Sequence, residues 1–198
     1  MFHPTSVLMT EAGPLQGIQK QPKNADFAIN CFLGIPYAAP PVGDHRWKDP
    51  QPLESWRETR TCFDFAADFP QASNPLFRAP NQSEDCLYLN VWAPELKQAQ
   101  KLPVMVWIHG GGFVGGSGSD QRSDGTLMAA KGVVVVSFNY RSGVFGFLAH
   151  PELSAESDLK VSGNYGLQDQ IAALKWIQKN INQFGGDPNK VTVFGVSA

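Results

Sequence analysis

The chain has 198 residues, which corresponds to one ordinary domain or to part of a larger one. An apolar content of 42% is enough to bury a core, and 17% charged residues are too few for a disordered polyelectrolyte. The formal net charge of −2 provides no basic excess for nucleic acid or for an anionic membrane surface, so we expect neither as a partner. No apolar run approaches the ~20 residues of a membrane helix.

The first residues contain no basic segment followed by a long apolar stretch, so the sequence predicts no signal peptide. Cys31, Cys62 and Cys86 are widely spaced and form neither a CxxC pair nor a zinc-binding pattern. We therefore expect reduced structural thiols in a cytoplasmic protein, with no metal site and no organic cofactor.

The first hundred residues are interrupted by proline and glycine and predict short strands within 32–35 and 87–92. A rigid loop is expected at 37–43, and polar composition predicts exposed connections at 71–83 and 95–101. We interpret this region as a short-stranded antiparallel extension of the same domain rather than as a second domain.

Three later runs, 103–108, 133–136 and 191–194, are apolar and rich in β-branched residues, which is typical of parallel strands buried on both faces. Between the last two runs, apolar residues recur at steps of three and four and predict a helix that ends at Gly185-Gly186. The order strand, helix, strand implies a right-handed crossover and an α/β fold class. The predicted apolar stripe consists of Leu167, Ile171, Leu174, Ile177, Ile181 and Phe184.

Two glycine-rich segments directly follow predicted strands: 109–112 follows the first run and 195–198 the third. A serine on a sharp strand-to-helix turn exposes its hydroxyl at the top of a sheet, and the strained backbone of that turn requires glycine two residues before and after it. Gly195 stands two residues before Ser197, and the residue two after it would be number 199. The segment therefore has the Gly-x-Ser-Ala pattern of such a turn without its last glycine, a pattern that taken alone often occurs by chance.

Acyl transfer also needs donors aimed at the oxygen that becomes negative, and glycines let backbone N–H groups approach it. Gly111 and Gly112 can supply two such groups, and Ala198 a third. Taken alone, a glycine run is more often a flexible turn. A phosphate-binding loop is excluded because 110–119 lacks the Gly-Lys-Ser/Thr ending, and a dinucleotide fingerprint is unsupported because 115–118 opens no convincing helix.

Taken together, these segments resemble the type-B carboxylesterases, which are α/β-hydrolases. The resemblance runs from about Thr10 to Ala198. The segments that carry it are 34–43 with Arg46-Trp47, 84–94, 107–113, 139–141, 163–164, 166–170 and 184–188.

The resemblance implies an incomplete α/β-hydrolase domain over residues 1–198, with a mostly parallel central sheet that is cut at the nucleophile elbow. It implies that Ser197 is the catalytic nucleophile, which attacks a small-molecule carboxylic ester and passes through an acyl-enzyme. Gly111, Gly112 and Ala198 would form the oxyanion hole. It also implies a buried structural ion pair between Arg46 and Glu84.

The family's catalytic order is serine, then an acid, then a histidine. None of the four histidines follows Ser197, so we expect the 198-residue chain alone to hydrolyse esters negligibly. We interpret His109 as a support of the oxyanion loop and His150 as a surface or packing residue. An acid in the first turn of the predicted helix is explained by the helix dipole, so Asp169 is not assigned as the triad acid.

Three departures from the family pattern bear on specificity. Val196 stands where many relatives have Glu, which argues against cationic substrates. Phe69 stands where secreted relatives have a cysteine that pairs with the equivalent of Cys86, with Cys62 as the alternative partner here. The 70–86 loop contains no tryptophan to hold choline, so cholinesterase activity is disfavoured.

Several alternatives stay open at this point. Phe113, Phe138, Phe145 and Phe147 could line an acyl pocket, although core packing is the simpler interpretation of Phe138. The second hypothesis for function is a catalytically dead relative that recognises proteins, and a third is a lipase or thioesterase on the same scaffold. The sequence does not define the oligomeric state.

Overall fold

The computed structural model describes residues 3–73, 79, 81–95 and 101–198. The strands are β1 (His3–Pro4), β2 (Leu8–Met9), β3 (Pro14–Gln16), β4 (Ile18–Lys20), β5 (Ile29–Pro36), β6 (Arg60–Thr61), β7 (Tyr88–Pro94), β8 (Leu102–Ile108), β9 (Val134–Phe138) and β10 (Gly186–Gly195). The α-helices are α1 (Thr126–Ala129), α2 (Gly143–Phe147), α3 (Pro151–Glu156) and α4 (Tyr165–Asn180), and short 3₁₀ helices span Gly43–His45, Gln121–Ser123 and Ile181–Phe184.

The described residues form a seven-stranded mixed sheet in the order β1-β4-β5-β7-β9-β8-β10, together with a small sheet of β2, β3 and β6. Pairs from β1 to β9 are antiparallel, whereas β8 pairs in parallel with both β9 and β10. The predicted α/β class with an antiparallel N-terminal region is confirmed. That region is not limited to short strands, because β5 has eight residues and β7 has seven.

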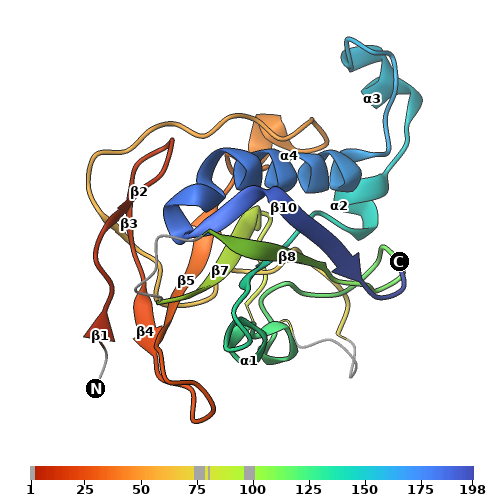
Figure 1. Cartoon of the computed structure of the whole chain (residues 1–198). Helices are drawn as coiled ribbons and strands as arrows, with labels where there is room; N and C mark the ends of the chain where they lie inside the picture. Colours follow the sequence, from red (N-terminus) through yellow and green to blue (C-terminus); the bar gives the residue numbers. More distant parts are fainter. Residues whose placement is uncertain (1–2, 74–78, 80, 96–100) are drawn as a thin grey trace.

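The three predicted parallel strands lie next to one another, and this arrangement positions the glycine-rich segments. β8 separates β9 from β10, so the chain passes over one strand between them and forms α2, α3 and α4 on the way. Figure 1 shows β8 and β10 side by side, with the chain's C-terminal end beyond the tip of β10. The carboxyl ends of β8 and β10 therefore meet at one edge, as parallel strands require.

The core lies where β-branched strands pack against α4. All five residues of β9 are buried, which fits a strand covered on both faces. Val104 and Val106 of β8 are fully buried and belong to the same cluster as Ala173 and Ile177 of α4. The edge strand β10 is largely exposed along its final residues.

The predicted apolar stripe on α4 is only half correct. Ile177, Ile181 and Phe184 are buried, but Leu167 and Ile171 are 41% and 44% exposed. The buried face of α4 instead includes Asp169, Ala173 and Trp176. The reason is that Asp169 turns inward to meet a buried arginine, and this polar pairing overrides the apolar period. The predicted stop is confirmed, because Gly185 caps the final 3₁₀ turn in the left-handed region, with φ 82°.

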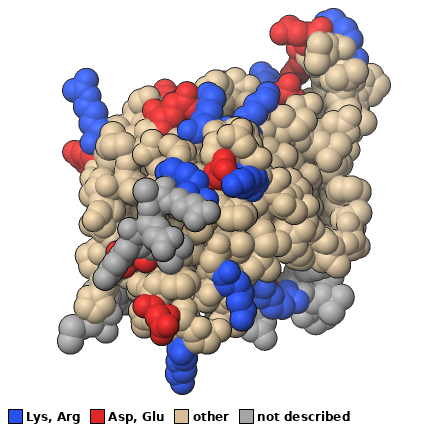
Figure 2. All heavy atoms as spheres, in the orientation of Figure 1, with Lys and Arg blue, Asp and Glu red and all other residues tan. Residues whose placement is uncertain are grey.

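The three cysteines are buried and free, so no bond joins Cys86 to Cys62. The predicted connections at 71–83 and 95–101 fall partly on residues 74–78, 80 and 96–100, which lie outside the described residues. Within the described part of the chain, no helix is long and apolar enough to span a membrane. On the face seen in Figure 2, acidic and basic side chains are interspersed.

Candidate active site

Ser197 lies on a strained turn immediately after β10. Its φ is +60°, in the left-handed region that side chains rarely adopt, as expected for a nucleophile elbow. Gly195 pairs with Ile108, and a Cβ on Gly195 would lie 2.5 Å from the carbonyl oxygen of Ile108. Only glycine fits there, because β8 and β10 approach each other closely just before the turn. The parallel pairing of β8 with β10 thus places Ser197 beside the glycine run.

Two backbone amides of that glycine run converge on one oxygen atom next to Ser197. The N–H groups of Gly111 and Gly112 both donate to the main-chain oxygen of Ala198, the last residue of the chain, at 2.7 Å for Gly111 and closer for Gly112. An oxygen held by two N–H groups is the arrangement that stabilises an oxyanion. The contact that Ala198 makes here uses its carbonyl oxygen, so the predicted role of its own amide as a third donor stays a prediction.

A pocket of about 470 Å³ contains Ser197 and the glycine run Gly110–Gly112. Its other lining residues are Trp107, His109, Ser117, Asp120, Arg122, Ser123 and Val196. A larger groove of about 890 Å³ lies beside α4 and contains none of the predicted site residues. None of the four phenylalanines considered for an acyl pocket lines the pocket at Ser197.

His109 is a buried support of the glycine run. Its ring is stacked between Tyr140, with centroids 4.3 Å apart, and Phe69, at 6.0 Å. Tyr140 donates a hydrogen bond to the His109 carbonyl at 2.8 Å. Nδ1 lies 3.1 Å from the Gly110 carbonyl, which can only accept, so Nδ1 carries the proton of the neutral ring. Burial lowers the pKa of His109 to about 4, so the ring is a poor base at neutral pH.

The buried neutral His109 predicts a loss of stability in mild acid. Because the pKa is about 4 in the fold and about 6.5 in an unfolded chain, protonation favours unfolding as the pH falls from 6.5 to 4. This difference amounts to about 3 kcal/mol at 1.36 kcal/mol per pKa unit. We expect the unfolding free energy of the wild type, relative to that of His109→Phe, to shrink by about this amount over that range.

Urea unfolding at a series of pH values measures the effect. Burial also raises the pKa of Asp68 to about 6, which changes stability in the opposite direction, but this contribution is common to both proteins and cancels in the difference. Parallel pH profiles for the two proteins would contradict the interpretation of His109.

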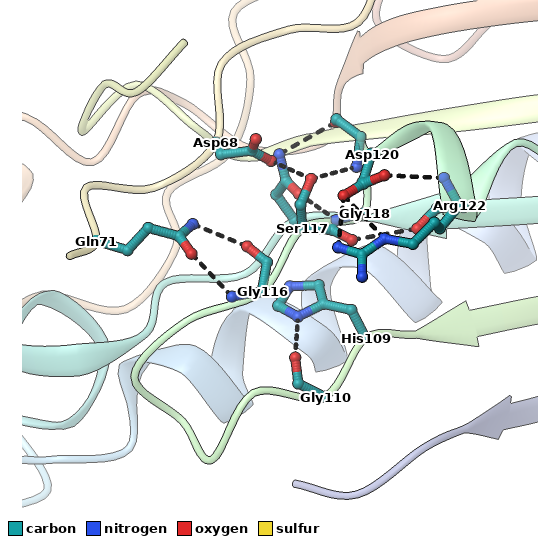
Figure 3. Close-up of polar contacts among 12 residues, drawn as sticks. Asp68, Gln71, His109, Gly110, Gly116, Ser117, Gly118, Asp120 and Arg122 are labelled. Carbon is teal, nitrogen blue, oxygen red and sulfur yellow. Dashed lines mark hydrogen bonds and ion pairs between the residues drawn. The ribbon is translucent and has the colours of Figure 1, made fainter. Parts of the chain in front are cut away.

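A short segment, Asp68–Gln71, contacts the glycine loop and holds it in place, and no sequence pattern predicts this role. The Gln71 carboxamide donates to the Gly116 carbonyl at 2.8 Å and accepts from the Gly116 amide at 2.9 Å. The Ser117 hydroxyl donates to Asp68 at 2.7 Å, and Phe69 stacks on His109. Figure 3 shows the contacts of Gln71 with Gly116 and of Asp68 with Ser117. The predicted surface loop therefore begins with a residue that is anchored to the site.

Arg46 and Glu84 form the predicted ion pair, but the pair is not buried. Nε and Nη2 of Arg46 lie 2.5 and 2.7 Å from the two Glu84 oxygens. The side chains are 38% and 25% exposed, because the pair lies at the surface between a loop and the segment before β7. The hydrogen bond from Arg46 lowers the pKa of Glu84. Because both side chains are partly exposed to water, this ion pair contributes less to the free energy of unfolding than a buried pair would.

The buried ion pair of this fold is instead Arg141–Asp169. Asp169 is fully buried and accepts from Nη2 and Nε of Arg141 at 2.7 and 2.8 Å, and from the Arg141 backbone amide at 3.0 Å. The helix dipole therefore does not explain Asp169, and that interpretation was wrong: the carboxylate lies beyond the first turn and neutralises a buried cation.

The structure also places His150 and two of the phenylalanines, Phe138 and Phe113. His150 is exposed and caps α3, since its Nδ1 accepts from the Glu152 amide at 3.3 Å. Phe138 is fully buried in the core, as its place in the strand indicated. Phe113 packs on Phe147 with ring centroids 4.9 Å apart and is 40% exposed. Among the described residues no group of three or more His, Cys, Asp or Glu side chains could hold a metal ion.

Comparison with known proteins decides the family. The model of the carboxylesterase family matches residues 4–198. The chain belongs to the carboxylesterase family. It is 53% identical over 197 residues to a fumonisin B1 esterase of Sphingopyxis macrogoltabida and 46% identical to a para-nitrobenzyl esterase of Bacillus subtilis (strain 168). These alignments cover 98% and 97% of this chain but 35% and 38% of the two relatives, so the chain spans little more than a third of their length.

Solved structures agree with this assignment. A thermophilic PNB esterase is 45% identical and superimposes with a TM-score of 0.84 over 96% of this chain and 38% of its own. Among the relatives matched by sequence, an acetylcholinesterase of Danio rerio is 46% identical over 206 residues, which cover 98% of this chain and 32% of that protein. The α/β-hydrolase architecture predicted from the motifs is thus shared with members of this family.

Proposed function

We propose that this chain carries the nucleophile and oxyanion hole of a serine hydrolase that cleaves carboxylic esters. The observation that carries the proposal is the convergence of the Gly111 and Gly112 amides on one oxygen beside Ser197, whose backbone is strained. In the reaction, Ser197 Oγ attacks the ester carbonyl carbon while its proton passes to a base. The ester's carbonyl oxygen takes the place of the Ala198 oxygen and becomes negative between the two amides. The alcohol then leaves with a proton, and water releases the acyl group from Ser197 as a carboxylic acid.

The names of the relatives support ester hydrolysis: each relative named above is an esterase or a cholinesterase. They do not favour the alternative, a catalytically dead recognition module, and Ser197 is present in this chain. The cytoplasmic location stays a prediction from the sequence, as does the assignment of residues 1–198 to one incomplete domain.

We infer that the 198-residue chain alone hydrolyses esters negligibly. A serine hydroxyl without a general base is a weak nucleophile at neutral pH. His109 is the histidine that shares the pocket with Ser197, and its low pKa and its bond to Gly110 suit support rather than proton transfer. Because the chain spans little more than a third of its relatives, the activity experiments below use the protein produced from the complete gene.

The proposal predicts that a fluorophosphonate probe labels the complete protein and that peptide mapping places the adduct on Ser197. Ser197→Ala is expected to abolish the labelling, because the oxygen of an activated serine displaces fluoride from the probe and forms a phosphonate ester. The matched control is Ser55→Ala, which removes the hydroxyl of an exposed serine outside the pocket at Ser197 and is expected to label like the wild type. Labelling that persists in Ser197→Ala would refute the assignment.

A further inference from the structure

The pocket at Ser197 contains one cationic side chain among the described residues that line it, Arg122. Arg122 lines the pocket from the 3₁₀ turn Gln121–Ser123, and its side chain is 60% exposed. The other charged residue of the lining is Asp120, whose side chain is only 3% exposed. The positive member of this pair is therefore the one that is accessible to a ligand, and the negative member is almost fully buried.

Asp120 holds the Arg122 guanidinium in a fixed position. Its Oδ2 accepts from Nη2 at 2.7 Å and from Nε at 3.2 Å, and its Oδ1 accepts from the Arg122 backbone amide at 2.9 Å. Figure 3 shows the guanidinium against the Asp120 carboxylate. The hydrogen bond that Arg122 donates to Asp120 raises the pKa of Arg122, so the side chain stays cationic at every working pH. Asp120 therefore binds the side of the planar guanidinium that carries Nε and Nη2. Nη1, on the other side, makes no bond to Asp120.

Apart from Asp120, the described residues that line the pocket include no acidic side chain that would repel a negative charge next to Arg122. Val196, beside the nucleophile, is apolar. Two further carboxylates of this region already have partners: Asp68 is buried and accepts the Ser117 hydroxyl at 2.7 Å, and Asp124 pairs with Lys20 at 3.0 Å. A pre-oriented guanidinium recognises carboxylates through charge-assisted hydrogen bonds, which are stronger than neutral ones.

We propose that Arg122 is a specificity-determining residue that binds a carboxylate on the substrate, so that the site prefers esters carrying a second, ionised carboxyl group. The inference rests on the proposed function, because it places that carboxylate in the cavity of Ser197. It names the substrate class: half-esters of dicarboxylic acids, or esters with an equivalent anionic group within the reach of the 470 Å³ pocket.

The first test compares two esters with the same reacting group and acyl length. Mono-p-nitrophenyl adipate has a carboxylate where p-nitrophenyl hexanoate has its terminal methyl group. We measure the ratio of kcat/KM for the adipate ester to that for the hexanoate ester. In Arg122→Gln this ratio is expected to fall about tenfold, the size of one charge-assisted hydrogen bond. Arg122→Lys keeps the charge without the planar fork and is expected to lie in between.

The matched control is Arg57→Gln, which makes the same change of charge at an exposed arginine outside this pocket. It is expected to keep the wild-type ratio, which separates a local contact from an effect of net charge. A ratio in Arg122→Gln equal to that in Arg57→Gln would overturn the proposal.

A second test does not depend on catalysis. Adipate itself is titrated into the wild type, Arg122→Gln and Arg57→Gln, and binding is followed by calorimetry. The dissociation constant is expected to rise about tenfold in Arg122→Gln alone. If Ser197 is not labelled by the fluorophosphonate but adipate binding still requires Arg122, the proposed function fails and the anion site stands. If Ser197 is labelled while neither measurement depends on Arg122, the inference on substrate class fails by itself.

Discussion

Asp169→Ala is expected to destabilise the fold by about 3–5 kcal/mol, because it leaves a buried arginine without its counter-charge. Arg141 is 2% exposed and Asp169 is fully buried, so water cannot replace the lost partner. Burial alone would lower the pKa of Arg141, but its hydrogen bonds to Asp169 offset this effect and hold the pKa above its ordinary value. Removing the carboxylate removes that compensation and leaves the backbone amide of Arg141 without its acceptor as well.

Chemical denaturation followed by tryptophan fluorescence measures the loss. The matched comparison is Glu84→Ala, which also removes the acid of a bidentate arginine pair but at a partly exposed site. Its effect is expected to be clearly smaller, because water solvates the remaining Arg46. A double variant, Arg141→Met with Asp169→Leu, is expected to recover part of the loss, since it removes both buried charges. Equal effects of Asp169→Ala and Glu84→Ala would contradict this account.

The two ion pairs show what sequence motifs can predict and what they cannot. Arg46 and Glu84 were predicted as partners from the family motifs, and they do pair, but motifs contain no information on burial. Arg141 and Asp169 each lie in a motif, yet the predicted apolar period assigned the inner face of α4 to Leu167 and Ile171. Periodicity counts apolar residues and cannot recognise an acid that turns inward to meet a cation 28 positions away.

The predictable part of the site was the part with local signatures. β8, β10 and the turn at Ser197 follow from apolar β-branched runs that end in glycine, and the parallel pairing then brings them together. The anchor between Gln71 and Gly116 joins residues 45 positions apart, and the one between Asp68 and Ser117 joins residues 49 apart. A glutamine or an aspartate in a polar loop carries no local sign of such a partner, so these contacts required the structure.

The glycine run itself gives the prediction with the largest expected effect on rate. A Cβ on Gly110 would overlap the carbonyl oxygen of Val196 and lie 3.1 Å from the Cβ of Ser197. Both neighbours belong to the elbow, so Gly110→Ala is expected to push the elbow away from the amides of Gly111 and Gly112. Loss of one oxyanion donor lowers kcat by about 100- to 1,000-fold, and we expect Gly110→Ala to lower the kcat of the complete protein by at least about 100-fold.

The pattern of kinetic change distinguishes this cause from general damage. Because the amides act on charge that develops in the transition state, kcat is expected to fall with the substrate's KM changed far less. The control is Gly132→Ala, which places a methyl group at a residue with φ +88° and no atom within 4 Å of the added Cβ. That change strains the backbone by about 1–2 kcal/mol, outside the pocket, and so reports the kinetic effect of lowered stability alone. A kcat for Gly110→Ala close to that of Gly132→Ala would mean that contact between the glycine run and the elbow does not determine the rate.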